Sequence, residues 1–337
     1  MKLFFGFFIG IALLFLNSCS NKQSEEKVVS QKFVHKYGFD VSEQEWAERE
    51  KDGQIITTLH NGVTIVNTYK NGELHGDTTF SFPSSDIVRE LHVYDEGVLL
   101  KKVVYEENSM PLREDVYEFD DRKIITLWNS KGLPLSIEVY ERNALMSGKY
   151  FNERNEVEAA VSDGKGVRVK KDRSNILVCK DRIENGQVIE RTKYYPNGKV
   201  QSVSNFLDYK LHGEQKTFTP SGKPALKMQW NHGVLDGIKV VYRNNVIHKE
   251  IPYIKGEKHG VERHFHSESG ALAAEIHWVN DRKHGSARFF DEDHAKVAWY
   301  YHGKAVSLKQ FEILEFREEM LAELQDQNPS RVQKAIE

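Results

Sequence analysis

The sequence predicts a mostly β protein, an elongated antiparallel sheet of about ten stacked hairpin repeats of 23–25 residues, followed by a C-terminal capping helix. Three observations predict this fold. Aromatic residues recur at a nearly constant spacing, short turns rich in Asn and Gly follow them, and apolar and polar residues alternate between the turns. Alternation with period two indicates a strand with one apolar face, and Asn-Gly pairs supply the positive φ angles that close hairpins.

The composition narrows the classes of function. The 337 residues are 29% charged and 39% hydrophobic, which suits a soluble body and excludes a bundle of membrane-spanning helices. The 47 Lys and Arg residues are balanced by 50 Asp and Glu residues. The chain therefore has no overall basic field, and no nucleic-acid partner is expected.

Residues 1–18 are typical of a cleaved signal peptide. Lys2 is followed by the uncharged run Leu3–Leu16, and a polar segment begins soon after it. A transmembrane anchor is the alternative. A helix that crosses the hydrocarbon needs about 20 apolar residues, however, and this run is shorter and stops at Asn17.

The segment Leu16-Asn17-Ser18-Cys19 resembles the lipobox of bacterial lipoproteins. The resemblance implies that Cys19 becomes the N-terminus, carries acyl chains such as palmitate and anchors the protein to a membrane. Each buried CH₂ contributes roughly 0.8 kcal/mol, so two or three acyl chains would hold the body firmly. Residues 19–45 would then form a lipidated flexible tether. Cys179 is the one other cysteine, and we expect it to be a buried small hydrophobe without a disulfide partner.

Two interleaved series of aromatic residues define a repeat array over residues 46–306. The gaps within one series are 23, 24, 23 and 25 residues, and those within the other are 24, 23, 25 and 23. The first series is Tyr195, Phe218, Tyr242, Phe265 and Phe290, and the second is Phe206, Trp230, Tyr253, Trp278 and Tyr301. The register extends back to Tyr69 and Phe82. The unit around 152–182 is degenerate, because the charged run Arg168–Arg173 replaces the expected aromatic residue.

The pattern aromatic-x-Asn-Gly-x-x-His-Gly resembles the MORN-variant repeats of the YwqK-like family. The resemblance covers about 250 residues and is strongest from Tyr194 to Tyr301. It implies a twisted antiparallel sheet of consecutive hairpins, with a bend, bulge or pause expected where the pattern is lost, between Glu106 and Gly186. The residues assigned to repeat turns are Asn71, Gly72, His75, Gly76, Asn197, Gly198, His212, Gly213, Gly233, Gly237, Gly256, His259, Gly260, His284, Gly285 and Gly303.

The histidines of the His-Gly pairs invite a comparison with metal ligands. Stacked hairpins would set equivalent histidines about 10 Å apart, two strand spacings. A single zinc ion binds each ligand at about 2 Å, so one ion cannot bridge them. We therefore assign these histidines to turn structure and expect neither a metal nor a cofactor.

Two further groups of residues each have two interpretations. The aromatic residues Trp230, Tyr253, Trp278, Trp299 and Tyr301 are either core and cross-strand ladders or an exposed recognition face for a glycan or protein. The run Arg168–Arg173 is either a binding site for a phosphate-bearing lipid or glycan, or a solvated edge whose charges prevent self-association.

A helix is expected over residues 307–327. Ser307-Leu-Lys-Gln310 has the form of a capping box, and the residues after it contain neither Gly nor Pro before Pro329. A broad apolar face is made by Phe311, Leu314, Phe316, Met320, Leu321 and Leu324. This face is predicted to lie against the last hairpin and cap the array, with a partner-binding helix as the alternative. Residues 328–337 are expected to be disordered.

The sequence contains no His-Glu-x-x-His, no Gly-x-Ser-x-Gly, no calcium loop and no Gly-rich phosphate loop, so no enzyme activity is expected. We predict a membrane-anchored, non-catalytic binding or scaffold lipoprotein of the bacterial envelope, with an unidentified protein or glycan partner. Ser20 differs from the Asp that retains some lipoproteins at the inner membrane, which favours the outer membrane. The alternatives are an antitoxin or immunity-like protein, a label often attached to YwqK-like repeats, and a hydrolase of envelope polymers.

Overall fold

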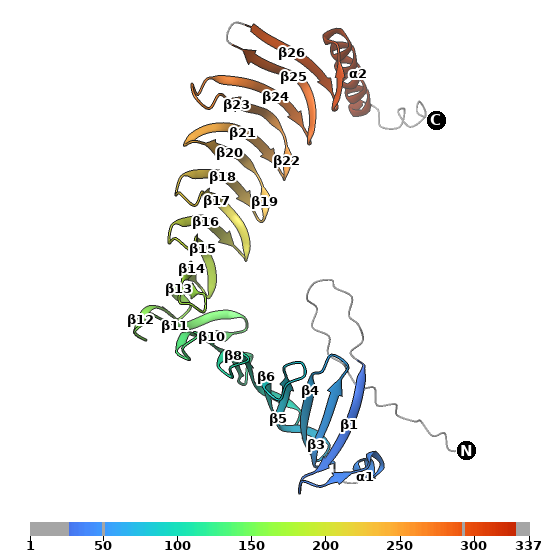
Figure 1. Cartoon of the computed structure of the whole chain (residues 1–337). Coiled ribbons are helices and arrows are strands. Elements are labelled where there is room, and N and C mark those ends of the chain that lie inside the picture. The colour runs from blue at the N-terminus through green and yellow to red at the C-terminus, as the bar shows by residue number, and fades with distance from the viewer. Residues whose placement is uncertain (1–26, 49–50, 292–293, 328–337) are drawn as a thin grey trace, which may run out of the picture. The chain divides into compact units, whose positions relative to one another are not determined.

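The structure is a computed structural model that describes residues 27–48, 51–291 and 294–327 (Figure 1). The predicted signal peptide, Cys19, the first part of the predicted tether and the C-terminal tail lie outside these residues. Strands account for 64% of the structure, and the described residues form 27 strands and two helices. None of the described helices is both long enough and apolar enough to span a membrane.

The described residues cluster into two compact units, the first made of residues 27–89 and 94–98. Strand β1 pairs with β2 and β3, and the antiparallel order continues through β4 and β5. The elements that lie wholly in this unit are β1 Val28–His35, β2 Asp40–Val41, α1 Glu43–Glu48, β3 Gly53–Leu59, β4 Thr64–Lys70 and β5 Glu73–Ser81.

The prediction of a flexible tether up to residue 45 is wrong for residues 28–45, which contain β1, β2 and the start of α1. The backbone of β1 pairs with β3 from Val28 to His35. Trp46 of α1 is buried and packs against Phe33 of β1, with ring centroids 5.8 Å apart. The segment lacks the repeat motif, so its pairing with β3 could not be predicted from the periodic pattern.

The second unit contains residues 90–93 and 99–327, and its strands pair one after another in antiparallel hairpins (Figure 1). Strands β6 Val88–Asp95 and β7 Val98–Tyr105 contribute residues to both units. The next elements are β8 Pro111–Tyr117, β9 Arg122–Trp128, β10 Pro134–Glu141, β11 Ala144–Phe151, β12 Val157–Ser162, β13 Lys165–Lys171, β14 Leu177–Glu184, β15 Gln187–Tyr194 and β16 Val200–Leu207. They are followed by β17 Lys210–Phe218, β18 Pro224–Asn231, β19 Val234–Leu235, β20 Gly237–Arg243, β21 Val246–Ile254, β22 Glu257–Lys258, β23 Gly260–Phe265, β24 Leu272–Val279, β25 Arg282–Asp291, β26 His294–Tyr301, β27 Lys304–Val306 and α2 Leu308–Gln327.

Two-residue turns with positive φ at both positions recur every 21 to 25 residues. This is the geometry of the tight turns that match the twist of antiparallel strands. The pairs are 71–72, 96–97, 120–121, 142–143, 163–164, 185–186, 208–209, 232–233, 255–256, 280–281 and 302–303. The hairpins therefore continue through residues 152–182, where the sequence motif is degenerate. The predicted fold class, an antiparallel sheet of stacked hairpins followed by a C-terminal helix, is confirmed.

Consecutive turns are joined by backbone hydrogen bonds. The Gly233 N–H donates to the carbonyl of Leu211 at 2.7 Å, and the Gly256 N–H donates to that of Leu235 at 2.8 Å. The same step recurs in the degenerate unit, where the Gly186 N–H donates to the Gly164 carbonyl at 2.9 Å. Each turn thus satisfies an amide that its own hairpin leaves unpaired, which holds neighbouring hairpins in phase.

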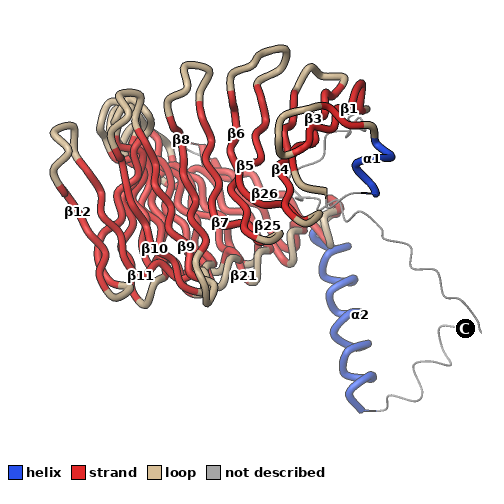
Figure 2. Tube along the Cα trace, turned by 90° about the horizontal axis from the view of Figure 1, so that it is seen from below, coloured by secondary structure: helices blue, strands red, loops and turns tan. Residues whose placement is uncertain are grey.

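Helix α2 begins at the predicted capping box. The Gln310 N–H donates to Ser307 Oγ at 3.2 Å, and the Ser307 N–H donates to Gln310 Oε1 at 3.1 Å. Phe311 is buried, with its ring centroid 5.1 Å from that of Trp299. The rest of the predicted apolar face is largely exposed, and Figure 2 shows α2 extending away from the strands. The expectation that the whole face covers the last hairpin is therefore wrong, because only the first turns of the helix contact the sheet.

Candidate binding surface

One face of the second unit carries a row of four aromatic rings, one on each of four successive hairpins from β17 to β26. Each ring lies opposite a glycine of the adjacent strand, in the pairs Gly213 with Trp230, Gly237 with Tyr253, Gly260 with Trp278 and Gly285 with Tyr300. We call the face that bears these four rings the aromatic face. All four rings are half-buried, so each contributes both to packing and to the accessible surface.

Three of the five aromatic residues predicted as a candidate binding face lie in this row, namely Trp230, Tyr253 and Trp278. The other two, Trp299 and Tyr301, flank Tyr300 on β26 and therefore point to the opposite face. Their rings lie 5.1 and 6.3 Å from that of Phe311 on α2. The sequence pattern places Tyr301 in the row, whereas the structure places Tyr300 there. A shift of one residue along a strand moves the side chain to the opposite face.

Cationic and polar side chains accompany the rings of the aromatic face. The Lys258 Nζ atom lies 4.3 Å from the ring centroid of Trp278, and Lys283 Nζ lies 4.9 Å from that of Tyr300. The indole N–H of Trp230 donates to Gln215 Oε1 at 3.0 Å. Rings with adjacent ammonium groups offer flat apolar contacts beside positive charge, a combination suited to glycan or protein recognition.

The predicted turn residues occupy turns and bulges along the edge of the sheet. The ten glycines assigned to repeat turns all have positive φ, and so does Asn71. The pairing register shifts next to the His-Gly pairs at Gly76, Gly213 and Gly285, which marks a β-bulge at each of them. Asn197 donates through Nδ2 to the carbonyl of Pro220 in the next turn of its series, at 2.9 Å.

The repeat histidines contact the turn that follows them. The His232 N–H donates to Nδ1 of His212 at 3.5 Å, and the His302 N–H donates to Nδ1 of His284 at 3.3 Å. Similarly, Nδ1 of His259 lies 3.3 Å from Oδ1 of Asn280, and Nδ1 of His75 lies 3.1 Å from Oδ1 of Asp95. Among the residues that the structure describes, no group of three or more His, Cys, Asp or Glu side chains is placed to hold a metal ion.

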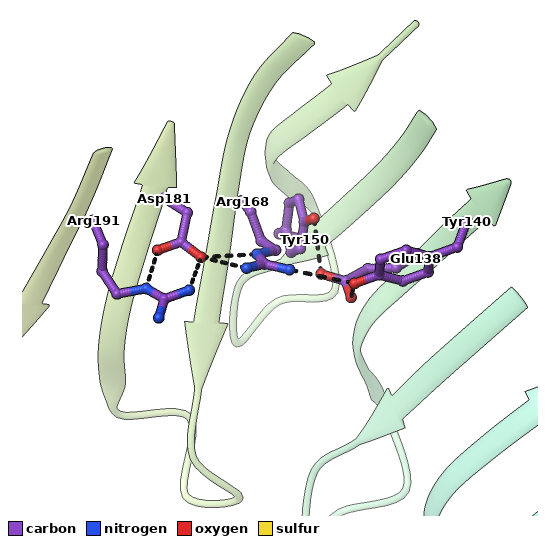
Figure 3. Close-up of polar contacts among 6 residues, drawn as sticks. All are labelled: Glu138, Tyr140, Tyr150, Arg168, Asp181 and Arg191. Atoms are coloured by element: carbon purple, nitrogen blue, oxygen red, sulfur yellow. Dashed lines mark hydrogen bonds and ion pairs between the residues drawn. The ribbon is translucent and has the colours of Figure 1, made fainter. Parts of the chain in front are cut away.

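A buried ionic network lies where the sequence motif is degenerate (Figure 3). Asp181 on β14 is fully buried between Arg168 on β13 and Arg191 on β15. Arg168 donates to Asp181 Oδ2 from Nε at 2.9 Å and from Nη2 at 2.6 Å. Arg191 donates from Nε to Oδ1 at 2.7 Å and from Nη2 to Oδ2 at 3.0 Å. One carboxylate thus accepts hydrogen bonds from two guanidinium groups.

The same network reaches across strands that are not adjacent. Arg168 Nη1 donates to the hydroxyl of Tyr140 on β10 at 3.3 Å, although β11 and β12 lie between β10 and β13 in the pairing order. Tyr140 and Tyr150 donate to the two oxygens of Glu138 at 2.7 and 3.0 Å. The sheet therefore coils tightly at β10–β13. A core forms there from Leu145, Tyr150, Val161, Val169 and Ile183.

The expectation that Arg168–Arg173 forms a solvated edge is wrong at three of its four cations, whereas Lys170 is exposed. Arg168 is 8% exposed and binds Asp181. Lys171 Nζ donates to the carbonyl of Phe151 at 2.9 Å, and Arg173 pairs with Glu106. The coiling of the sheet brings these partners within reach, so the charges are neutralised within the protein instead of by solvent.

The network has a definite charge state at neutral pH. Burial alone would raise the pKa of Asp181, but the hydrogen bonds from Arg191 and Arg168 outweigh it and hold that pKa below its usual value. Burial raises the pKa of Tyr150, and the negative charge of Glu138 raises it further. Burial likewise raises the pKa of the free thiol of Cys179, which is 5% exposed. Asp181 is therefore ionised, whereas the tyrosine and the thiol remain neutral.

The ionic network and the aromatic row share one face of the sheet. Asp181 pairs directly with Arg191, Arg191 with Ser204, and Ser204 with Gln215. Gln215 in turn accepts the indole hydrogen bond of Trp230. Residues directly opposite one another in a sheet point to the same face. The aromatic face therefore continues into the buried network.

A hollow of about 790 Å³ lies beside this network, and Tyr140 forms part of its wall. Its lining also includes Arg122 and Lys123, which pair with carboxylates. Arg122 lies 2.8 Å from Glu118, and Lys123 lies 3.2 Å from Asp115. The charges in the wall of the hollow are thus paired within the protein, and the surface next to the network is polar.

Comparison with known families identifies two repeats. Residues 187–208 and 211–232 match the MORN repeat variant. These segments correspond to the hairpins β15–β16 and β17–β18, and the same hairpin geometry continues on both sides of them. No curated protein matches the chain. MORN repeats are compatible with a binding or scaffold role.

Proposed function

We propose that this protein is a lipid-anchored, non-catalytic binding scaffold of the bacterial envelope. In this proposal, acyl chains on Cys19 hold it at the outer membrane, and the aromatic face binds a protein or glycan. The observation that carries the binding role is the in-phase row of Trp230, Tyr253, Trp278 and Tyr300. The MORN repeat matches support the same role.

The aromatic face has the properties of a recognition surface. Helix α2 packs through Phe311 against Trp299, which points away from this face, so the described part of the helix leaves the row accessible. Aromatic rings supply large contact areas at a low cost in side-chain entropy, and such residues dominate the binding energy of many interfaces. Lys258 pairs with the buried carboxylate of Glu262 at 3.0 Å. Lys283, which lies beside both Trp278 and Tyr300, is therefore the cation that favours a ligand with acidic groups.

The anchor is supported by the sequence of the N-terminal segment, in which an uncharged run precedes Ser18-Cys19. Replacement of Cys19 by Ser tests it, because a hydroxyl cannot carry the thioether-linked lipid. Labelled fatty acid should enter the wild type but not Cys19→Ser, and the variant should be unprocessed or lost from the membrane fraction. Absence of label from the wild type, together with unchanged fractionation of the variant, would contradict the anchor.

The binding face is tested by shortening its rings. Trp278→Ala and Trp230→Ala should reduce capture of the cellular partner. Ile238→Ala is the matched control, because this exposed residue lies on the opposite face of β20. Equal capture by all three variants would exclude the aromatic face as the binding surface.

A further inference from the structure

We propose that the free side of α2 is a second docking site, which binds a basic amphipathic helix of a partner protein. Four apolar residues define this site, the α2 stripe, namely Ile313, Phe316, Met320 and Leu324. Their side chains are 44, 62, 46 and 52% exposed. Spacings of three and four residues place them along one side of the helix. A stripe of this kind is the surface that a second amphipathic helix covers.

The opposite side of α2 is attached to the end of the array. Phe311 packs against Trp299, the Tyr301 hydroxyl donates to Glu318 at 2.7 Å, and His302 Nε2 lies 3.1 Å from the same carboxylate. These contacts hold the first turns of the helix on β26 and on the turn that follows it, while the α2 stripe faces solvent. A partner therefore meets a helix that is already formed, so binding costs little ordering entropy.

The charge beside the stripe specifies the partner. Glu312, Glu319 and Glu323 follow one border of the α2 stripe at helical spacing, whereas the other border carries Arg317, so the charge beside the stripe is acidic in sum. No ion pair to the three glutamates is present within the described part of the chain. Glu315 and Glu318, by contrast, face the histidines of the last hairpins. When two helices pack side by side, residues at their borders meet and select partners by charge. A helix with Lys or Arg beside its own apolar stripe complements this border.

Charge also distinguishes this occupant from others. A second copy of α2 packed antiparallel would bring the acidic border of one helix against that of the other. An anionic bilayer would repel the same three glutamates, whereas membrane-surface helices carry Lys and Arg on their polar face. The proposal therefore commits to a cationic helix and is independent of what the aromatic face binds.

The probe is a synthetic helical peptide of about 20 residues with a leucine stripe bordered by lysines, and its twin carries glutamates at the lysine positions. Fluorescence anisotropy with the purified full chain should show at least about tenfold tighter binding of the lysine peptide. The double variant Phe316→Glu/Met320→Glu should weaken that binding by more than about tenfold. Ile238→Glu is the control, since this residue is 52% exposed on β20, points away from the aromatic face and lies outside the stripe.

A charge reversal provides the decisive comparison. Glu312→Lys/Glu319→Lys/Glu323→Lys should invert the preference, so that the glutamate peptide binds more tightly. Circular dichroism of every variant should retain the wild-type spectrum, which separates lost binding from lost folding. The proposal is overturned by equal binding of both peptides, by no binding of the lysine peptide, or by dimerisation of the chain through the stripe. Binding that appears only after removal of residues 328–337 would also overturn it, in favour of an intramolecular occupant.

Discussion

Asp181 is the residue whose replacement tests the structure of the coiled centre most sharply. Asp181→Asn keeps the shape of the side chain but removes the charge that faces Arg168 and Arg191. The carboxylate is fully buried and accepts four hydrogen bonds at 2.6 to 3.0 Å. Removal of one partner from a buried ion pair costs about 3–5 kcal/mol, because the remaining charge stays desolvated. Since the Asn carbonyl keeps part of the hydrogen bonding, we expect about 3 kcal/mol.

Glu214→Gln is the matched control for this substitution. The Glu214 carboxylate also lies between two cations, at 2.5 Å from Lys216 and 2.8 Å from Lys227, but its side chain is 33% exposed. Exposed ion pairs contribute about 0–1 kcal/mol, because water replaces the lost partner. The two variants therefore differ mainly in the burial of the carboxylate.

Native-state hydrogen exchange is the suitable assay, because stability in stacked repeats is local and a single midpoint does not describe it. A loss of about 3 kcal/mol should speed exchange of the slowest amides in β13–β15 by roughly a hundredfold in Asp181→Asn. Glu214→Gln should change the amides of β17 and β18 by less than about fivefold. Similar small effects from both variants would refute the inference that the ionic network stabilises the coiled centre.

Three further predictions follow from individual groups. The native pKa of Asp181 is lowered, so the stability that its carboxylate gives the fold is complete above about pH 4 and is lost as the pH falls through the native pKa. Acid unfolding followed by circular dichroism should therefore be less steep in Asp181→Asn. The pKa of Tyr150 is raised, so the stability that its neutral phenol gives the fold is complete below about pH 10 and is lost at higher pH. Tyr150→Phe should therefore remove one late-titrating phenol from the ultraviolet absorbance titration. Gly164→Ala should destabilise the protein more than Gly198→Ala does in chemical denaturation. Both glycines have positive φ, but only at Gly164 would an added Cβ meet a neighbour, the Gly186 nitrogen at 2.7 Å. At Gly198 an added Cβ meets nothing within 4 Å. Strain at φ alone costs about 1–2 kcal/mol, so equal losses in the two variants would contradict the close stacking of the turns.

The repeating part of the fold could be predicted because each hairpin is encoded locally. Asn or Gly in two-residue turns and alternating apolar residues fix both the turn and the face of each strand, as at the turns Asn71-Gly72 and Asn185-Gly186. The predicted helix also begins where the capping box of Ser307 and Gln310 places it. These signals depend on residues a few positions apart, so a single sequence is sufficient to detect them.

The candidate sites depended on register and coiling, which a single sequence reveals less well. Arg168, Asp181 and Arg191 lie on three strands, and only their cross-strand alignment shows that they meet. Tyr300 replaces Tyr301 in the aromatic row because one residue of register exchanges the faces. For α2, the sequence indicates an apolar face but not how much of it the sheet covers.

Site-directed photo-crosslinking in intact cells tests the binding role of the sheet most directly. Lys239 and Ile238 are neighbours on β20, and Lys239 pairs with Ile251 on the same face as Tyr253, whereas Ile238 points to the opposite face. A photoreactive residue at 239 should capture one defined envelope protein or glycan, and the same residue at 238 should not. Capture from both positions alike, or from neither, would contradict the proposal that the aromatic face binds the partner.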